Sequence, residues 1–88
     1  MYQVVILPKA LKDLSKLDKS IIKRIMDKLT WLSDNIEIIN TVPLKSKLSE
    51  FYKLKIGDYR VIYDIDYSGK VVTVHKAGHR KEIYKDKD

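Results

Sequence analysis

The sequence has no cysteine, only two histidines, three glycines and two prolines, and no long apolar run. Without cysteine the chain can form neither a disulfide framework nor a cysteine-based zinc site, and two histidines are too few to suggest another metal site. No apolar stretch approaches the roughly 18 residues that a membrane-spanning helix needs. The N-terminal segment MYQVVILPKA has neither a charged leader nor a cleavage site. We therefore expect a cytoplasmic protein with no membrane association, metal or cofactor.

Positive charge is what the sequence has in excess. Eighteen Lys and Arg residues against twelve Asp and Glu give a net charge of +6 on 88 residues. A field of this strength on a small body attracts polyanions, although charge alone does not distinguish RNA, DNA, anionic lipid and an acidic protein. Because the chain is short and has no internal repeat or Gly/Ser linker, we predict one domain over residues 1–88.

The first half of the chain predicts a strand and two helices. Residues 2–7 form a short β-branched run that ends at Pro8, which suits the first turn of a helix. Asp18 is expected to be the N-cap of a second helix. Trp31 and two apolar stripes are expected in the core, the stripes being Ala10, Leu11, Leu14, Leu17 and Ile21, Ile22, Ile25, Met26, Leu29, Leu32. The solvent side of the first helix is expected to carry Lys9, Lys12, Asp13 and Lys16.

Two turn signals organise the second half. Gly57-Asp58 separates two β-like runs, 51–56 and 59–66, and a Gly-first pair suits a two-residue hairpin loop. Ser68-Gly69 indicates a second such turn before a strand over residues 71–77. The predicted fold is α+β: an N-terminal strand, a two-helix hairpin and a three-stranded antiparallel meander, with the helices packed on one face of the sheet. Residues 36–50 are expected to be a surface connection.

This register places several cations on one face of the sheet. Lys55 is expected directly opposite Arg60, with Lys53 diagonal to Arg60. Like charges opposite each other destabilise a sheet by up to roughly 1 kcal/mol, which favours an anionic ligand on this face. The alternative is that the long side chains extend into water, or that Asp64 and Asp66 at the far end of the same face neutralise part of the charge.

The tail GHRKEIY is expected to leave the last strand. Either it is a frayed basic terminus, or Ile83 and Tyr84 pack back onto the body and carry Arg80 to the rim of the cationic face. No further C-terminal helix is expected. His75, inside the last strand, is expected to be a packed sheet residue.

The segments YKLKIGDYRVIY (52–63) and GHRKEIY (78–84) resemble the RelE/ParE superfamily of bacterial and archaeal toxins, and the resemblance extends over essentially the whole chain. It implies a ribosome-dependent mRNA endonuclease held inactive by a cognate antitoxin encoded beside it. The resemblance implies a catalytic set of Lys53, Lys55, Arg60, Arg80 and Tyr84, with His79 as an alternative to Arg80. We also expect RNA contacts from Lys45, Lys47 and Lys81.

The chemistry predicted for this set is attack by an RNA 2′-hydroxyl on its adjacent phosphate. Lys55, or Lys53 close behind it, is the predicted general base because neighbouring cations favour loss of its proton. Arg60 is expected to stabilise the phosphorane, Arg80 or His79 to assist the leaving oxygen, and Tyr84 to stack on a base. The alternatives are a ParE-like inhibitor of DNA gyrase, a branch that generally lacks the lysine pair, and a non-catalytic RNA-binding module.

Overall fold

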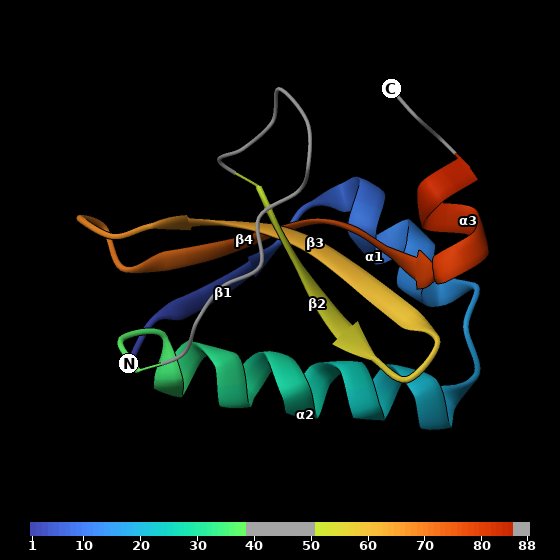
Figure 1. Ribbon diagram of the computed structural model, residues 1–88, viewed down its shortest axis with the longest axis horizontal. Helices are drawn as coiled ribbons and strands as arrows, with labels where there is room; N and C mark the ends of the chain where they lie inside the picture. Colours follow the sequence, from blue (N-terminus) through green and yellow to red (C-terminus); the bar gives the residue numbers. More distant parts are fainter. Residues whose placement is uncertain (39–50, 86–88) are drawn as a thin grey trace.

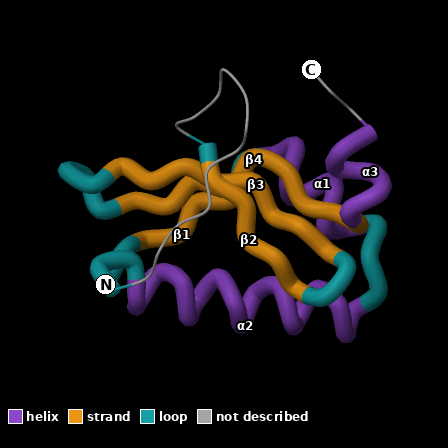
Figure 2. Tube along the Cα trace, viewed as in Figure 1, coloured by secondary structure: helices purple, strands orange, loops and turns teal. Residues whose placement is uncertain are grey.

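The computed structural model describes residues 1–38 and 51–85. They form a four-stranded sheet with three helices, in the predicted α+β class (Figures 1 and 2). The elements in chain order are β1 (Gln3–Ile6), α1 (Pro8–Ser15), α2 (Lys19–Asn35), β2 (Tyr52–Ile56), β3 (Tyr59–Asp66), β4 (Val71–His79) and α3 (Arg80–Lys85). The strand order is β1-β4-β3-β2, with β1 parallel to β4 and the other neighbours antiparallel. Within the described residues, no helix is long and apolar enough to cross a membrane.

The core lies between the sheet and the helices α1 and α2. Its largest fully buried side chains come from α2 and from the two central strands: Ile25, Leu29, Leu32, Val61, Tyr63, Val72 and Val74. Burial raises the pKa of the Tyr63 phenol to about 12. Three expectations about the helices are wrong, because Leu11 is 54% exposed, Met26 is 36% exposed and Trp31 is 43% exposed. Successive helical residues are about 100° apart, so Trp31 lies beside the stripe that Leu32 continues.

Helix α1 differs from the expectation at Asp13. This carboxylate does not face open solvent: Oδ2 accepts the backbone N–H of Ala77 at 3.1 Å, and Oδ1 pairs with Lys9 Nζ at 2.6 Å. Strand β1 pairs with β4 only as far as Val74, so Ala77 lies beyond the end of β1. Asp13 therefore replaces a missing strand partner and ties α1 to the second half of β4.

Helix α2 begins where the sequence indicates. Asp18 is its N-cap residue in an extended conformation, and its carbonyl accepts the N–H groups of Ile21 and Ile22, each at 3.0 Å. Its carboxylate makes no capping hydrogen bond. The start of the helix is thus fixed by the backbone and by packing of the apolar stripe.

The hairpin at Gly57-Asp58 has the predicted register, and Gly57 adopts the left-handed φ of 59° that suits glycine. The second turn is longer than expected, because residues 67–70 lie outside both strands and the positive φ falls on Lys70. Asp66 organises this loop, since its Oδ1 accepts the Gly69 N–H at 3.0 Å. The register of β3 and β4 shifts between Ile62 and Tyr63.

The C-terminal segment also differs from the expectation. Gly78 and His79 stay in β4 as partners of Arg60 and Tyr59, and a short helix, α3, follows at once. The Nδ1 atom of His79 accepts the N–H of Lys81 at 3.1 Å and so caps the start of that helix. Strand β4 thus runs two residues beyond its expected end at Ala77, and the tail after it is a helix instead of a frayed terminus.

Candidate active site

Three cations gather on one face of the sheet, and we call Lys53, Lys55 and Arg60 the basic cluster. Lys55 and Arg60 are cross-strand partners at the hairpin, as predicted. Lys53 lies two residues before Lys55 on β2, so its side chain projects to the same side. The hydrophobic core occupies the other face, where Leu54 and Val61 pair.

The guanidinium of Arg60 is held at the hairpin turn. Its Nη1 donates to the carbonyls of Gly57 at 2.8 Å and Tyr59 at 2.9 Å. Its Nε is buried and has no hydrogen-bond partner among the residues that the structure describes. A buried N–H without a partner costs free energy.

Helix α3 brings a phenol to the basic cluster. Lys53 Nζ lies 3.2 Å from the Tyr84 hydroxyl and 5.4 Å from the centre of its ring. Partial burial raises the pKa of Tyr84, but hydrogen bonding to Lys53 and Arg60 and their positive charge outweigh it, so the net pKa lies below the ordinary value. Tyr84 therefore packs back onto the body, the second of the two arrangements considered for the tail.

Arg80 also reaches this region. Its backbone N–H donates to the Asp58 carbonyl at 2.8 Å, and its Nε lies 3.9 Å from Asp58 Oδ1 in an exposed pair. Asp58 follows Gly57, whose carbonyl holds Arg60. Arg80 and Arg60 are thus attached to adjacent residues of one turn, which places Arg80 at the rim of the basic cluster.

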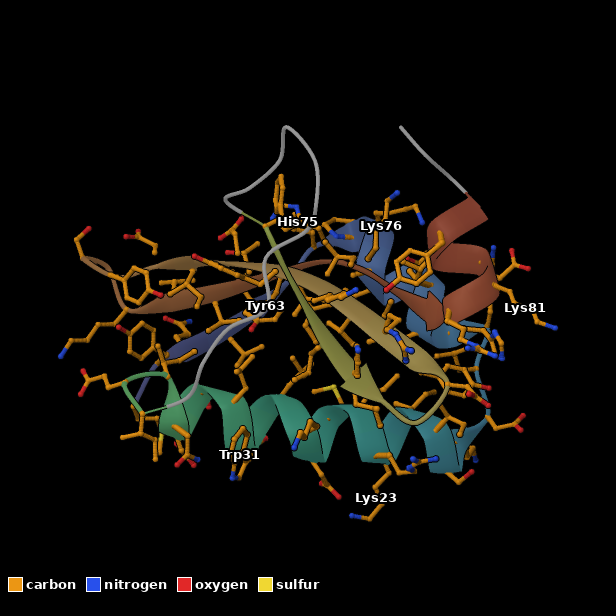
Figure 3. All side chains as sticks on the ribbon, viewed as in Figure 1. Lys23, Trp31, Tyr63, His75, Lys76 and Lys81 are labelled. Atoms are coloured by element: carbon orange, nitrogen blue, oxygen red, sulfur yellow. The ribbon has the colours of Figure 1, made fainter. Side chains whose placement is uncertain are left out.

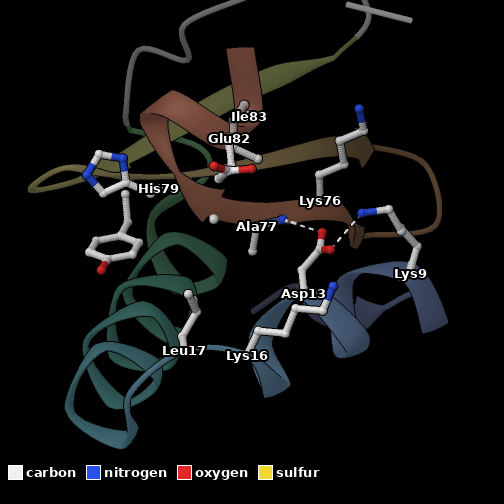
Figure 4. A pocket seen from close by; sticks show the side chains of 11 residues that line it. Lys9, Asp13, Lys16, Leu17, Lys76, Ala77, His79, Glu82 and Ile83 are labelled. Carbon is white, nitrogen blue, oxygen red and sulfur yellow. Dashed lines mark hydrogen bonds and ion pairs between the residues drawn. The ribbon is translucent and has the colours of Figure 1, made fainter. Parts of the chain in front are cut away.

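His79 does not join these groups. It is the cross-strand partner of Tyr59, and the two rings meet edge to face with centroids 5.4 Å apart. Its neighbour Gly78 is the partner of Arg60, so by strand alternation His79 faces the opposite side of the sheet. There it lines a groove that α1 contributes to, together with Asp13 and Glu82 (Figure 4).

Three further residues are expected to contact RNA outside the catalytic set, and only one of them lies in the described part of the chain. Lys45 and Lys47 lie outside the described residues. Lys81 is exposed on α3 and points away from the sheet (Figure 3). The contacts of all three residues with RNA stay a prediction.

A second polar group on the cluster's face is a histidine–aspartate pair. His75 Nε2 lies 2.5 Å from Asp64 Oδ2, and both side chains are about one-third exposed. Asp64 is therefore paired with His75 instead of neutralising the basic cluster. The sequence predicts both residues on this face, but not that they pair with each other. In residues 1–38 and 51–85, no three His, Cys, Asp or Glu side chains group as metal ligands do.

The chain matches one family model, described as "ParE toxin of type II toxin-antitoxin system, parDE", over residues 4–84. No curated protein matches it.

Several solved structures have the same fold. The toxin–antitoxin complex RelBE2 from Mycobacterium tuberculosis contains a chain with 28% identity and a TM-score of 0.80, with 90% of this chain and 98% of that chain covered. The isolated RelE toxin of E. coli is 26% identical with a TM-score of 0.76, covering 98% and 94%. The archaeal RelE–RelB complex from Pyrococcus horikoshii contains a chain with 27% identity and a TM-score of 0.69, with 90% of this chain and 94% of that chain covered. Because the family model spans nearly the whole sequence and RelE structures share the fold, this chain belongs to the RelE/ParE superfamily of type II toxin–antitoxin toxins.

Proposed function

We propose that this toxin is a ribosome-dependent endoribonuclease that cleaves mRNA at the basic cluster. The observation that carries the proposal is the arrangement of three cations on one sheet face with a phenol hydroxyl beside them. Lys55 opposite Arg60 costs the sheet stability unless an anion lies between them. A phosphate of a bound RNA strand is the anion that fits the family.

The reaction proposed is attack of the 2′-oxygen on phosphorus with breakage of the bond to the 5′-oxygen. The products are a 2′,3′-cyclic phosphate and a 5′-hydroxyl. Lys55 takes the proton from the 2′-hydroxyl, and Arg60 stabilises the charge on the phosphorane oxygens with its free N–H groups. Arginine keeps its own proton, so Arg80 assists the 5′-oxygen by hydrogen bonding.

Tyr84 is the proton donor that we propose for the 5′-oxygen. Its pKa lies below the ordinary value because Lys53 and Arg60 outweigh its desolvation. A more acidic phenol releases its proton more readily to a leaving oxygen. Lys53, in contact with the hydroxyl, then stabilises the phenolate. The exposed ring can still stack on a nucleotide base.

The partners proposed are a cognate antitoxin, the ribosome and mRNA, in the cytoplasm. The relatives from M. tuberculosis and P. horikoshii were solved as toxin–antitoxin complexes. The family model likewise describes the toxin of a toxin–antitoxin pair. A small protein encoded beside this chain is therefore expected to bind it and relieve its toxicity.

The test is cleavage of a defined mRNA on purified translating ribosomes. Lys55→Ala is expected to slow cleavage by about 100-fold or more, the usual contribution of a general base. The combined variant Lys55→Ala, Arg60→Ala and Arg80→Ala should be inactive. Lys19→Ala, an exposed residue at the start of α2, is the control and should cleave normally. Wild-type cleavage by the triple variant contradicts the proposal.

A second candidate function is inhibition of DNA gyrase without RNA cleavage. It is favoured by the description of the matching family model as a ParE toxin. The lysine pair at Lys53 and Lys55 argues against it, because the ParE branch generally lacks this pair. Supercoiling by purified gyrase separates the two: inhibition of gyrase without cleavage of ribosome-bound mRNA favours the second function and overturns the first.

A further inference from the structure

Trp31 lies on the surface of α2, apart from the core that the rest of the helix builds (Figure 3). It is 43% exposed, whereas Leu29 and Leu32 on the same helix are 1% and 0% exposed. An aromatic ring that is this exposed is available for contact with a ligand. The cationic side chains around the ring indicate the kind of ligand that it binds.

The ring lies in a groove between α2 and the edge strand β2. Helix α2 contributes Arg24, Asp27, Lys28 and Trp31, and the hairpin contributes Lys55 and Gly57. Three of these side chains are cations and one is a carboxylate. Asp27 is itself paired with Lys23 at 3.1 Å, outside the groove. The groove therefore presents net positive charge beside an aromatic ring.

Two contacts organise the cations around the ring and the turn. Lys28 Nζ lies 4.4 Å from the centre of the Trp31 ring, a cation–π contact. A Cβ atom on Gly57 would lie 3.0 Å from Arg24 Nη2, so the guanidinium of Arg24 lies directly against the hairpin turn. Glycine at this position leaves the room that the guanidinium occupies.

The groove is continuous with the basic cluster. Lys55 belongs to both, and Gly57, which Arg24 touches, also supplies the carbonyl that holds Arg60. Strand β2 is at the edge of the sheet, so within residues 1–38 and 51–85 no further strand separates the two sites. A polyanion bound at the cluster can therefore pass over the edge of β2 and into the groove.

We propose that this groove binds the single-stranded RNA that continues from the cleaved phosphate, with a base stacked on Trp31 and a phosphate contacted by Arg24. Cations that follow the backbone, combined with an aromatic ring for stacking, are the chemistry with which proteins bind single-stranded nucleic acid. The inference rests on the proposed function for the position of the cleaved phosphate. It adds a second nucleotide site, on the other side of the hairpin edge.

The chain has a single tryptophan, so its fluorescence reports on this groove alone. We expect a short single-stranded RNA with 2′-O-methyl groups, which cannot be cleaved by 2′-attack, to change the emission of Trp31 saturably. Trp31→Ala should weaken binding of the labelled oligonucleotide, measured by anisotropy, about 5- to 150-fold, the range for stacking of one base. Trp31→Phe should retain most of the affinity.

Removing one cation from the groove tests the phosphate contact independently of the tryptophan. Arg24→Ala should weaken binding and reduce its salt dependence, because one phosphate contact is lost. Lys19→Ala removes one charge from the same helix outside the groove and should have little effect. If Trp31→Ala and Arg24→Ala both bind like the wild type, the proposal is wrong.

The outcomes also separate this inference from the nuclease. One outcome is that the Trp31 and Arg24 variants bind RNA and cleave mRNA like the wild type, while Lys55→Ala cleaves poorly. This result overturns RNA binding in the groove and leaves the proposed function standing. An RNA-dependent change in Trp31 emission without cleavage on ribosomes supports the groove and overturns the nuclease. A change in emission on adding the antitoxin but none on adding RNA assigns the groove to a protein partner and overturns the proposal.

Discussion

Asp13 offers a stability test whose magnitude follows from its contacts. Its carboxylate accepts the N–H of Ala77, which is 4% exposed, and pairs with Lys9, whose side chain is 60% exposed. In Asp13→Ala, loss of the exposed ion pair costs about 0.3–0.5 kcal/mol. Alanine has a higher helix propensity than aspartate, which stabilises α1 by a similar amount. The net loss in the free energy of unfolding therefore comes from the unpaired N–H of Ala77, and it should be about 1–3 kcal/mol.

The assay is urea denaturation followed by circular dichroism. Asp13→Asn keeps an acceptor oxygen for Ala77 and should lose only about 0.5 kcal/mol, similar to Lys9→Ala. Asp13→Ala should be the least stable of the three variants. If Asp13→Ala and Asp13→Asn have the same free energy of unfolding, the carboxylate is not the partner that replaces β1 along β4, and the reasoning fails.

Three further predictions concern the cluster and its turn. Lys55→Gln removes the repulsion across the hairpin and should stabilise the fold by up to about 1 kcal/mol in urea denaturation, a gain that 1 M salt removes; a loss of stability refutes it. The difference in absorbance at 295 nm between the wild type and Tyr84→Phe isolates Tyr84 among the six tyrosines, and it should show ionisation at lower pH than the same difference measured with Lys53→Ala. Relative to Tyr84→Phe, the wild type should gain stability as the pH rises from the folded pKa of Tyr84 toward 10.0, whereas near pH 7 the difference between the two should not depend on pH. Gly57→Ala should cost about 1–2 kcal/mol because φ is 59° there; equal stability contradicts this.

Local patterns were sufficient to predict the hairpin and its register. The Gly57-Asp58 pair fixes one turn geometry, and alternation then assigns every neighbouring side chain to a face. This is why Lys55 opposite Arg60 could be predicted from the sequence and is confirmed by the structure. Turns with less constrained geometry were not predictable, as the loop over residues 67–70 shows.

Tertiary contacts account for the features that local patterns did not predict. Asp13 has the sequence environment of a solvent-facing helical residue, and only the position of β4 makes it a hydrogen-bond acceptor. Tryptophan is a residue type that is usually buried, but the position of Trp31 around the axis of α2 places it outside the apolar stripe. The family resemblance made His79 an alternative to Arg80, whereas strand β4 continues through His79 and directs its side chain to the other face.

The basic cluster as the site of 2′-hydroxyl attack is tested most directly by the chemistry of the cut ends. Ribosome-bound mRNA cleaved by this protein should carry a 2′,3′-cyclic phosphate on the upstream fragment and a 5′-hydroxyl on the downstream fragment. Mass spectrometry of the two fragments decides the matter. A 5′-phosphate on the downstream fragment would mean that water is the nucleophile, and would contradict the mechanism assigned to Lys55, Arg60 and Tyr84.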